Sequence, residues 1–103
     1  MIHHINKDQF EKEVLNSEIP VVIDFYASWC GPCRAQSKIL DNLDPKYDGV
    51  IKFCKCDVDE DPSFAEMFGI ETIPTLVFYK NKTKVGQYSG VMDEASIKRM
   101  LEI

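Results

Sequence analysis

The segment from Pro20 to Ala27 reads Pro-Val-Val-Ile-Asp-Phe-Tyr-Ala, which is an almost continuous apolar run rich in β-branched residues. It lacks the alternation of a strand with one solvated face and is typical of a strand covered on both faces, as in parallel sheets. The Cys-Gly-Pro-Cys segment Cys30–Cys33 follows almost at once. We therefore expect an α/β domain in which a cysteine pair lies where a central strand ends and a helix begins.

Four other segments have the character of strands. They are Ile2–Ile5, Val50–Cys56, Thr75–Tyr79 and Lys84–Tyr88. The last two flank a short polar turn, so they are expected to pair as an antiparallel hairpin. The centre of that turn is Asn81-Lys82 instead of the common Asn-Gly, and the turn type is therefore expected to differ.

Helices are predicted between these strands from their end signals and apolar spacing. The start signals are Asn6 with Gln9, Asp61 with Pro62, and Asp93. A further helix runs from Cys33 until Pro45 ends or distorts it. Its apolar face is predicted to consist of Ala35, Ile39, Leu40, Leu43 and Tyr47. The order β-α-β-α-β-α-β-β-α predicts a mixed sheet of about five strands flanked by about four helices.

The composition fits one globular domain over residues 1–103, with 45% hydrophobic and 28% charged residues. The formal charge of −5 and the scattered basic residues argue against nucleic-acid binding. No apolar stretch is long enough to span a bilayer, and the first residues do not resemble a secretory signal. We therefore expect a cytoplasmic protein that binds neither membranes nor nucleic acids.

Cys30 and Cys33 are separated by two residues at the expected start of a helix. A helix N-terminus carries unpaired N–H groups and a partial positive charge, which favour the nucleophilic thiolate form of Cys30. Pro32 lacks an N–H and suits the first turn of a helix. Gly31 lets the backbone bend and is expected to leave Cys30 uncovered, whereas Cys33 is better shielded. The pattern indicates a redox site, although zinc knuckles share this cysteine spacing.

The sequence around this cysteine pair resembles the thioredoxin family. The segment Trp29–Cys33, Trp-Cys-Gly-Pro-Cys, matches the family signature residue for residue. The resemblance extends to Asp24–Ala27 before it and to Ile73–Thr75 after it, and the expected order of elements also agrees. Essentially the whole chain is covered, which implies a thioredoxin fold.

The resemblance implies a thiol–disulfide oxidoreductase that reduces protein disulfides. Cys30 is implied to attack the disulfide of a target protein and Cys33 to resolve the mixed disulfide, after which a thioredoxin reductase-type donor restores the dithiol. The Gly31-Pro32 insert resembles that of reducing members; an oxidising or isomerising relative is the alternative. No cofactor is expected. The resemblance further implies a monomer that acts in electron transport and cell redox homeostasis.

Asp24 lies inside the apolar run, where a carboxylate is costly unless it is paired or protonated and where burial raises its pKa. From the residues alone, a strand-end aspartate turned toward water is the alternative. The resemblance implies that Asp24 takes the proton of Cys33 through water. Lys55 lies where the family often has a lysine near that aspartate, and it either tunes the site or lies on the surface.

Five residues are implied to form a surface for target proteins. The resemblance implies a cis peptide between Ile73 and Pro74, with the backbone of Ile73 open to an extended target, although most X–Pro bonds are trans. Trp29 is expected to be a partly exposed wall of this surface, with a core tryptophan as the alternative. Gly90 and Val91 resemble the loop that completes the groove, with a simple turn as the alternative.

Two further cysteines, Cys54 and Cys56, admit a rival function. With Cys30 and Cys33 they supply four thiolates for one zinc ion. However, they lie at i and i+2 on one face of a predicted strand, so two small buried side chains that cannot bridge each other fit better. No metal is therefore expected. A third hypothesis is a non-enzymatic interaction protein with the same fold, against which the intact Cys30–Cys33 pair argues.

Two positions depart from the family pattern. Many members have a proline where this chain has Lys38, and in this chain a proline appears later, at Pro45. The early part of the helix is therefore expected to be straighter, and the helix is expected to break sooner. Arg34 replaces a lysine that is common after the motif. Neither change removes a catalytic group, but both are expected to affect the choice of target.

Overall fold

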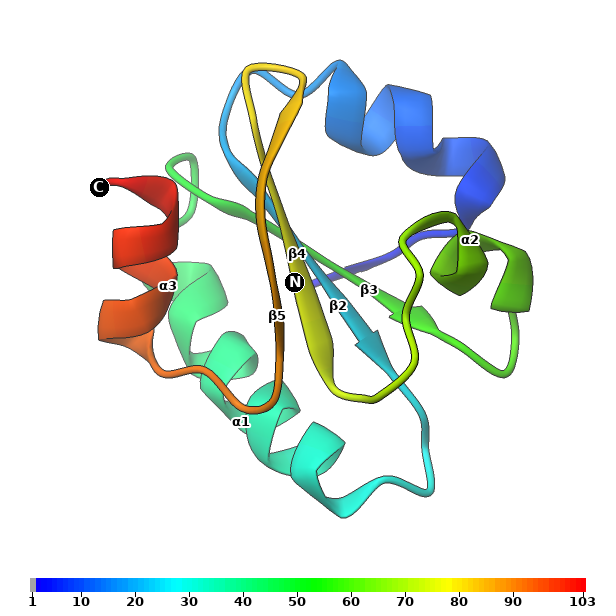
Figure 1. Ribbon diagram of the computed structural model, residues 1–103. Coiled ribbons are helices and arrows are strands. Elements are labelled where there is room, and N and C mark those ends of the chain that lie inside the picture. The colour runs from blue at the N-terminus through cyan, green and yellow to red at the C-terminus, as the bar shows by residue number, and fades with distance from the viewer. Residues whose placement is uncertain (1) are drawn as a thin grey trace.

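The computed structural model describes residues 2–103 and contains a mixed five-stranded sheet in the order β1-β3-β2-β4-β5 (Figure 1). The strands are β1 (His3–His4), β2 (Val21–Tyr26), β3 (Lys52–Asp57), β4 (Thr75–Lys80) and β5 (Thr83–Ser89). The helical elements are η1 (Lys7–Gln9), η2 (Glu11–Leu15), α1 (Gly31–Lys46), α2 (Pro62–Met67) and α3 (Glu94–Leu101). The predicted thioredoxin fold and the predicted order of elements are confirmed.

Strand β2 lies at the centre of the sheet, as its apolar sequence predicts. It pairs in parallel with β3 and antiparallel with β4, and β4 pairs antiparallel with β5. Every residue from Val21 to Phe25 is buried. Because both faces of β2 are covered, its sequence lacks the alternating pattern of a half-exposed strand.

Helices cover both faces of the sheet (Figure 1). Helices α1 and α3 lie on one face, and η1, η2 and α2 lie on the other. The buried residues divide accordingly into two clusters. One includes Val22, Leu40, Phe53, Leu76 and Ile97, and the other includes Val14, Ile23, Phe25, Cys54 and Phe64. Alternate residues of β2, β3 and β4 therefore contribute to opposite cores.

The predicted helix caps are present. Asn6 and Gln9 form a reciprocal capping box, and the side chains of Asp61 and Asp93 accept hydrogen bonds from the first turns of α2 and α3. The first helical segment differs from a regular α-helix, because η1 is a 3₁₀ turn and η2 a π-helical turn. Its apolar face nevertheless packs against the core, since Val14 is buried.

Helix α1 begins at Gly31 and runs without interruption to Lys46, so it ends directly after Pro45. The prediction for its inner face was wrong at one position, because Ala35 is exposed and Gln36 is fully buried. Cys33, Gln36, Leu40 and Leu43 are the buried residues, at helical spacing.

The start of β3 and the conformation of the β4–β5 turn also differ from the predictions. β3 begins at Lys52, and Val50 before it is half-exposed. The β4–β5 turn contains Asn81 and Lys82 with φ angles of 53° and 65°, the positive values of the type I′ turn that Asn-Gly prefers. The expected change of turn type was therefore wrong. None of the helices formed by residues 2–103 is long and apolar enough to cross a membrane.

Candidate redox site

The Cys30–Cys33 pair lies between the end of β2 and the first turn of α1. The two cysteines form a disulfide with their Cα atoms 5.3 Å apart. Cys30 is the N-cap of α1, and its Sγ accepts a hydrogen bond of 3.3 Å from the backbone N–H of Cys33. Pro32 occupies the first turn, where its missing N–H removes no helical hydrogen bond. The sulfur of Cys30 therefore faces the partial positive charge of the helix end.

Both cysteines are more enclosed than the sequence indicated. Cys30 is 5% exposed and Cys33 is 2% exposed. Cys33 is therefore the better shielded of the two, as expected, but Cys30 is also buried. The pair packs with Ala27, and Tyr26, Val58 and Ile73 lie against this cluster. In contrast, Gly31 and Pro32 between the cysteines are exposed. The exposed surface next to the cysteine pair is therefore formed in part by these two residues.

Ile73 and Pro74 are adjacent residues next to the cysteine pair, and Ile73 packs against it. Their peptide bond is cis, as the resemblance implied. The carbonyl oxygen of Ile73 lies 3.8 Å from Sγ of Cys30. The N–H of Gly90, which has a φ of 118°, donates a 2.8 Å hydrogen bond to the carbonyl oxygen of Pro74. Three segments that are distant in sequence thus meet at the disulfide.

Two exposed apolar side chains belong to segments near the cysteine pair in the sequence or joined to it through Pro74. Trp29 is 69% exposed, and its Nε1 donates a 2.8 Å hydrogen bond to Asp59. A hollow of about 160 Å³ beside it is lined in part by Val58, Ile70 and Ile73. Val91, which follows Gly90 in the chain, is 42% exposed.

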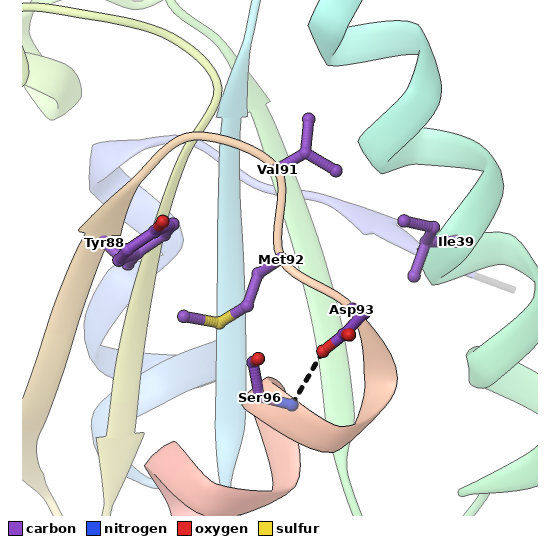
Figure 2. Close-up of a pocket in the computed structure, with 6 residues that line it drawn as sticks. All are labelled: Ile39, Tyr88, Val91, Met92, Asp93 and Ser96. Atoms are coloured by element: carbon purple, nitrogen blue, oxygen red, sulfur yellow. Dashed lines mark hydrogen bonds between the residues drawn. The ribbon is translucent and has the colours of Figure 1, made fainter.

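Val91 belongs to the loop between β5 and α3, which Figure 2 shows from close by. The side chain of Val91 points toward α1, where Ile39 points back toward the loop. These residues line a hollow of about 290 Å³ together with Tyr88, Met92, Asp93 and Ser96. The dashed line in Figure 2 is the cap of α3, in which Asp93 accepts from the N–H of Ser96 at 2.9 Å.

Asp24 is completely buried in the centre of β2. Within residues 2–103, neither carboxylate oxygen has a hydrogen-bond partner. Burial raises the pKa of Asp24 from 3.8 to about 7; the charge of Lys55 opposes this shift and that of Asp41 adds to it. The alternative of an aspartate turned toward water is therefore wrong. A carboxyl group with this pKa changes its protonation state near neutral pH.

Lys55 is the register partner of Asp24 in β3. Its ammonium group donates a 3.3 Å hydrogen bond to the hydroxyl of Ser37 in α1, and it lies 5.2 Å from the ring centre of Tyr26. The side chain is therefore packed between the sheet and α1, close enough to Asp24 to influence its pKa. Lys55 is half-buried and thus more enclosed than an ordinary surface lysine.

Cys54 and Cys56 are free and buried, and both belong to the core beneath α2, separate from the cluster of Cys30 and Cys33. Burial raises the pKa of each thiol to about 12. Residues 2–103 include no group of three or more His, Cys, Asp or Glu side chains arranged to hold a metal ion. The geometry thus gives the four-cysteine zinc hypothesis no support.

Sequence reasoning missed two residues that shape the site. Asp59 holds the exposed Trp29 through its indole N–H, and an acidic residue after a strand gives no signal for this contact. Gln36 binds the backbone of Met92, in the loop that carries Val91, through both ends of its amide. The spacing of Cys33, Gln36 and Leu40 on one helix face could have indicated its burial.

Arg34 and Lys38, the departures in α1, are both exposed. Arg34 donates a 3.3 Å hydrogen bond to the carbonyl oxygen of Ser28, in the loop that precedes Cys30. With Lys38 in place of a proline, α1 is uninterrupted through this region.

Comparison with known proteins gives a consistent result. The family model described as Thioredoxin matches residues 1–103. Thioredoxin 1 of Nostoc sp. is 39% identical over 98 residues, which cover 95% of this chain and 92% of that protein. Thioredoxin of Haemophilus influenzae is 38% identical with the same coverage. The chloroplastic M-type thioredoxin of Pisum sativum is 39% identical, again over 95% of this chain but over 57% of its own length.

Proposed function

The chain belongs to the thioredoxin family of thiol–disulfide oxidoreductases, and from that premise we propose a specific role for each residue of its site. Cys30 is the attacking thiolate and Cys33 the resolving one. The observation that carries this assignment is the position of Cys30 as the N-cap of α1, with its sulfur accepting the N–H of Cys33. The same hydrogen bond and the helix end favour a thiolate at Cys30 in the reduced protein.

The reaction proceeds by two thiol–disulfide exchanges. The Cys30 thiolate attacks one sulfur of a target disulfide, the target S–S bond breaks, and the first target thiolate leaves. The Cys33 thiolate then attacks Cys30 in the mixed disulfide, and the second target thiolate leaves. Two electrons pass from the dithiol to the target, and both released thiolates take up protons. A thioredoxin reductase-type donor supplies two electrons to restore the dithiol.

Asp24 receives the proton that Cys33 must lose before it attacks. Its pKa of about 7 allows the carboxylate to take up this proton near neutral pH, and its two oxygens have no competing partner within residues 2–103. A water molecule carries the proton between the two buried groups. Lys55 limits the rise of the Asp24 pKa and so keeps part of the population ionised at neutral pH.

Target proteins bind in the groove around the disulfide. The backbone of Ile73 pairs with an extended target segment by strand addition. Trp29 forms one wall, while Gly90 and Val91 form the other. The exposed apolar side chains of Trp29 and Val91 support this placement.

The protein acts as a single-domain monomer in the cytoplasm, where it reduces partners and contributes to electron transport and cell redox homeostasis. Four cysteines in 103 residues are too few for a secreted disulfide scaffold, which supports a reducing compartment. The exposed Gly31-Pro32 insert supports reduction over oxidation or isomerisation, by resemblance to reducing members of the family. The acidic charge of −5 supports the absence of nucleic-acid partners.

Reduction of insulin with dithiothreitol as electron donor tests the proposal. We expect the wild-type protein to accelerate the reaction and Cys30→Ser to leave only the rate of dithiothreitol alone. Cys54→Ser is the matched control and is expected to keep wild-type activity, because its thiol is buried in a separate core. Equal rates for wild type and Cys30→Ser would contradict the proposal.

A further inference from the structure

Gln36 is fully buried in α1, one turn after Cys33. Its side-chain amide makes two hydrogen bonds to a single residue. Nε2 donates to the carbonyl oxygen of Met92 at 3.1 Å, and the N–H of Met92 donates to Oε1 at 2.7 Å. The amide thus satisfies both backbone groups of a buried loop residue, as a neighbouring strand would do.

The loop that carries Val91 is held on both sides. On one side, the N–H of Gly90 donates to the carbonyl oxygen of Pro74 at 2.8 Å. On the other side, Met92 is bound to Gln36. Val91 lies between these two fixed residues and is 42% exposed. Figure 2 shows its side chain directed toward the gap between the loop and α1.

We propose that Gln36 is a positioning residue for protein targets, because its amide holds Val91 in place as a wall of the target groove. This inference rests on the function proposed above. Gln36 joins the helix that carries Cys33 to the loop that carries Val91, so the cysteine pair and the wall keep a fixed spacing. A protein target that contacts Val91 depends on this spacing, whereas a small disulfide that contacts only Cys30 does not.

The chemistry of position 36 supports positioning over simple core packing. The position belongs to the buried face of α1, with Cys33, Leu40 and Leu43, where an apolar side chain would pack without a hydrogen-bond requirement. A leucine there would leave the N–H and carbonyl groups of Met92 unpaired inside the protein, which is unfavourable. The loop could then satisfy these groups only by moving toward water, and Val91 would move with it.

The test compares Gln36→Leu with wild type on two substrates. With insulin as the protein target, we expect the KM to rise about fivefold and kcat to change less than about twofold, because binding common to ground and transition states is lost. With pre-reduced protein and 5,5′-dithiobis(2-nitrobenzoic acid), a small disulfide, the rate is expected to stay within about twofold of wild type. The control Val14→Ala alters the opposite core and is expected to leave both substrates unchanged.

Amide hydrogen exchange gives an independent measurement. In wild type the N–H groups of Gly90 and Met92 are expected to exchange slowly, and Gln36→Leu is expected to accelerate both while β2 stays protected. If Gln36→Leu does not fold, the exchange rates of the wild-type protein alone test the proposal. Rapid exchange of the Met92 N–H in wild type would overturn it. An unchanged insulin KM in a folded Gln36→Leu protein would also overturn it. Failure of the wild type itself to reduce insulin would instead contradict the proposed function.

Discussion

Asp24 and Lys55 are register partners across β2 and β3, yet the ammonium group of Lys55 donates its hydrogen bond to Ser37 in α1. The carboxylate itself has no hydrogen-bond partner within residues 2–103. The positive charge therefore opposes the effect of burial without cancelling it, and the pKa of Asp24 is raised to about 7. This balance leads to two predictions.

Replacing Asp24 with asparagine is expected to stabilise the oxidised protein increasingly as the pH rises. In the folded protein Asp24 stays protonated up to about pH 7, whereas in the unfolded chain its carboxyl group has the ordinary pKa of 3.8. Between these values the folded state binds more protons, so wild-type stability falls as the pH rises. The advantage of Asp24→Asn is therefore expected to grow from pH 4 to pH 7, by on the order of 4 kcal/mol, and then to level off.

Urea unfolding at a series of pH values measures this difference. The exposed Asp48→Asn is the control for loss of one negative charge, and its difference from wild type is expected to vary little over the same range. A stability difference between Asp24→Asn and wild type that is independent of pH would contradict the raised pKa.

Replacing Lys55 with methionine is expected to raise the pKa of Asp24 above its wild-type value. The charge of Lys55 is the influence that lowers this pKa, and methionine keeps much of the side-chain volume without the charge. Carboxyl-carbon NMR titration of Asp24 measures the change. Lys12→Met, which removes an exposed lysine in η2, is the control. An Asp24 pKa that stays the same or falls in Lys55→Met would show that Lys55 does not tune the site.

The four cysteines are expected to differ sharply in reactivity once the disulfide is reduced. Cys54 and Cys56 have thiol pKa values raised to about 12 by burial. At pH 8 their thiolate fraction, and hence their rate of modification, is expected to be about a thousandfold below that of an ordinary thiol. Titration with 5,5′-dithiobis(2-nitrobenzoic acid) should therefore detect two rapid thiols in the native protein and four in denaturant. The double variant Cys30→Ser/Cys33→Ser should have no rapid thiol; a third rapid thiol in wild type would contradict the buried state.

Local sequence signals were sufficient to predict a central strand and the starts of three helices. The run Val21–Phe25 indicated a central strand because both of its faces are buried. Asn6, Asp61 and Asp93 indicated helix starts because their side chains satisfy backbone N–H groups only a few residues away.

Features set by distant contacts could not be predicted in the same way. Gln36 was missed because its partner, Met92, is 56 residues away, and a glutamine is usually exposed. Lys82 adopts a positive φ because the β4–β5 pairing leaves only two residues for the turn, although lysine has no preference for that conformation. The enclosure of Cys30 likewise depends on Ile73, which the tertiary fold brings to it.

The order of attack by the two cysteines is most directly tested by trapping a mixed disulfide with Cys33→Ser. The reduced variant is mixed with insulin, quenched with acid and digested, and the linked peptides are identified by mass spectrometry. We expect a one-to-one adduct linked through Cys30, because the resolving thiol is absent, and no such adduct with Cys30→Ser. Absence of the adduct from Cys33→Ser, or linkage through Cys54 or Cys56, would contradict the assignment of Cys30 as the nucleophile.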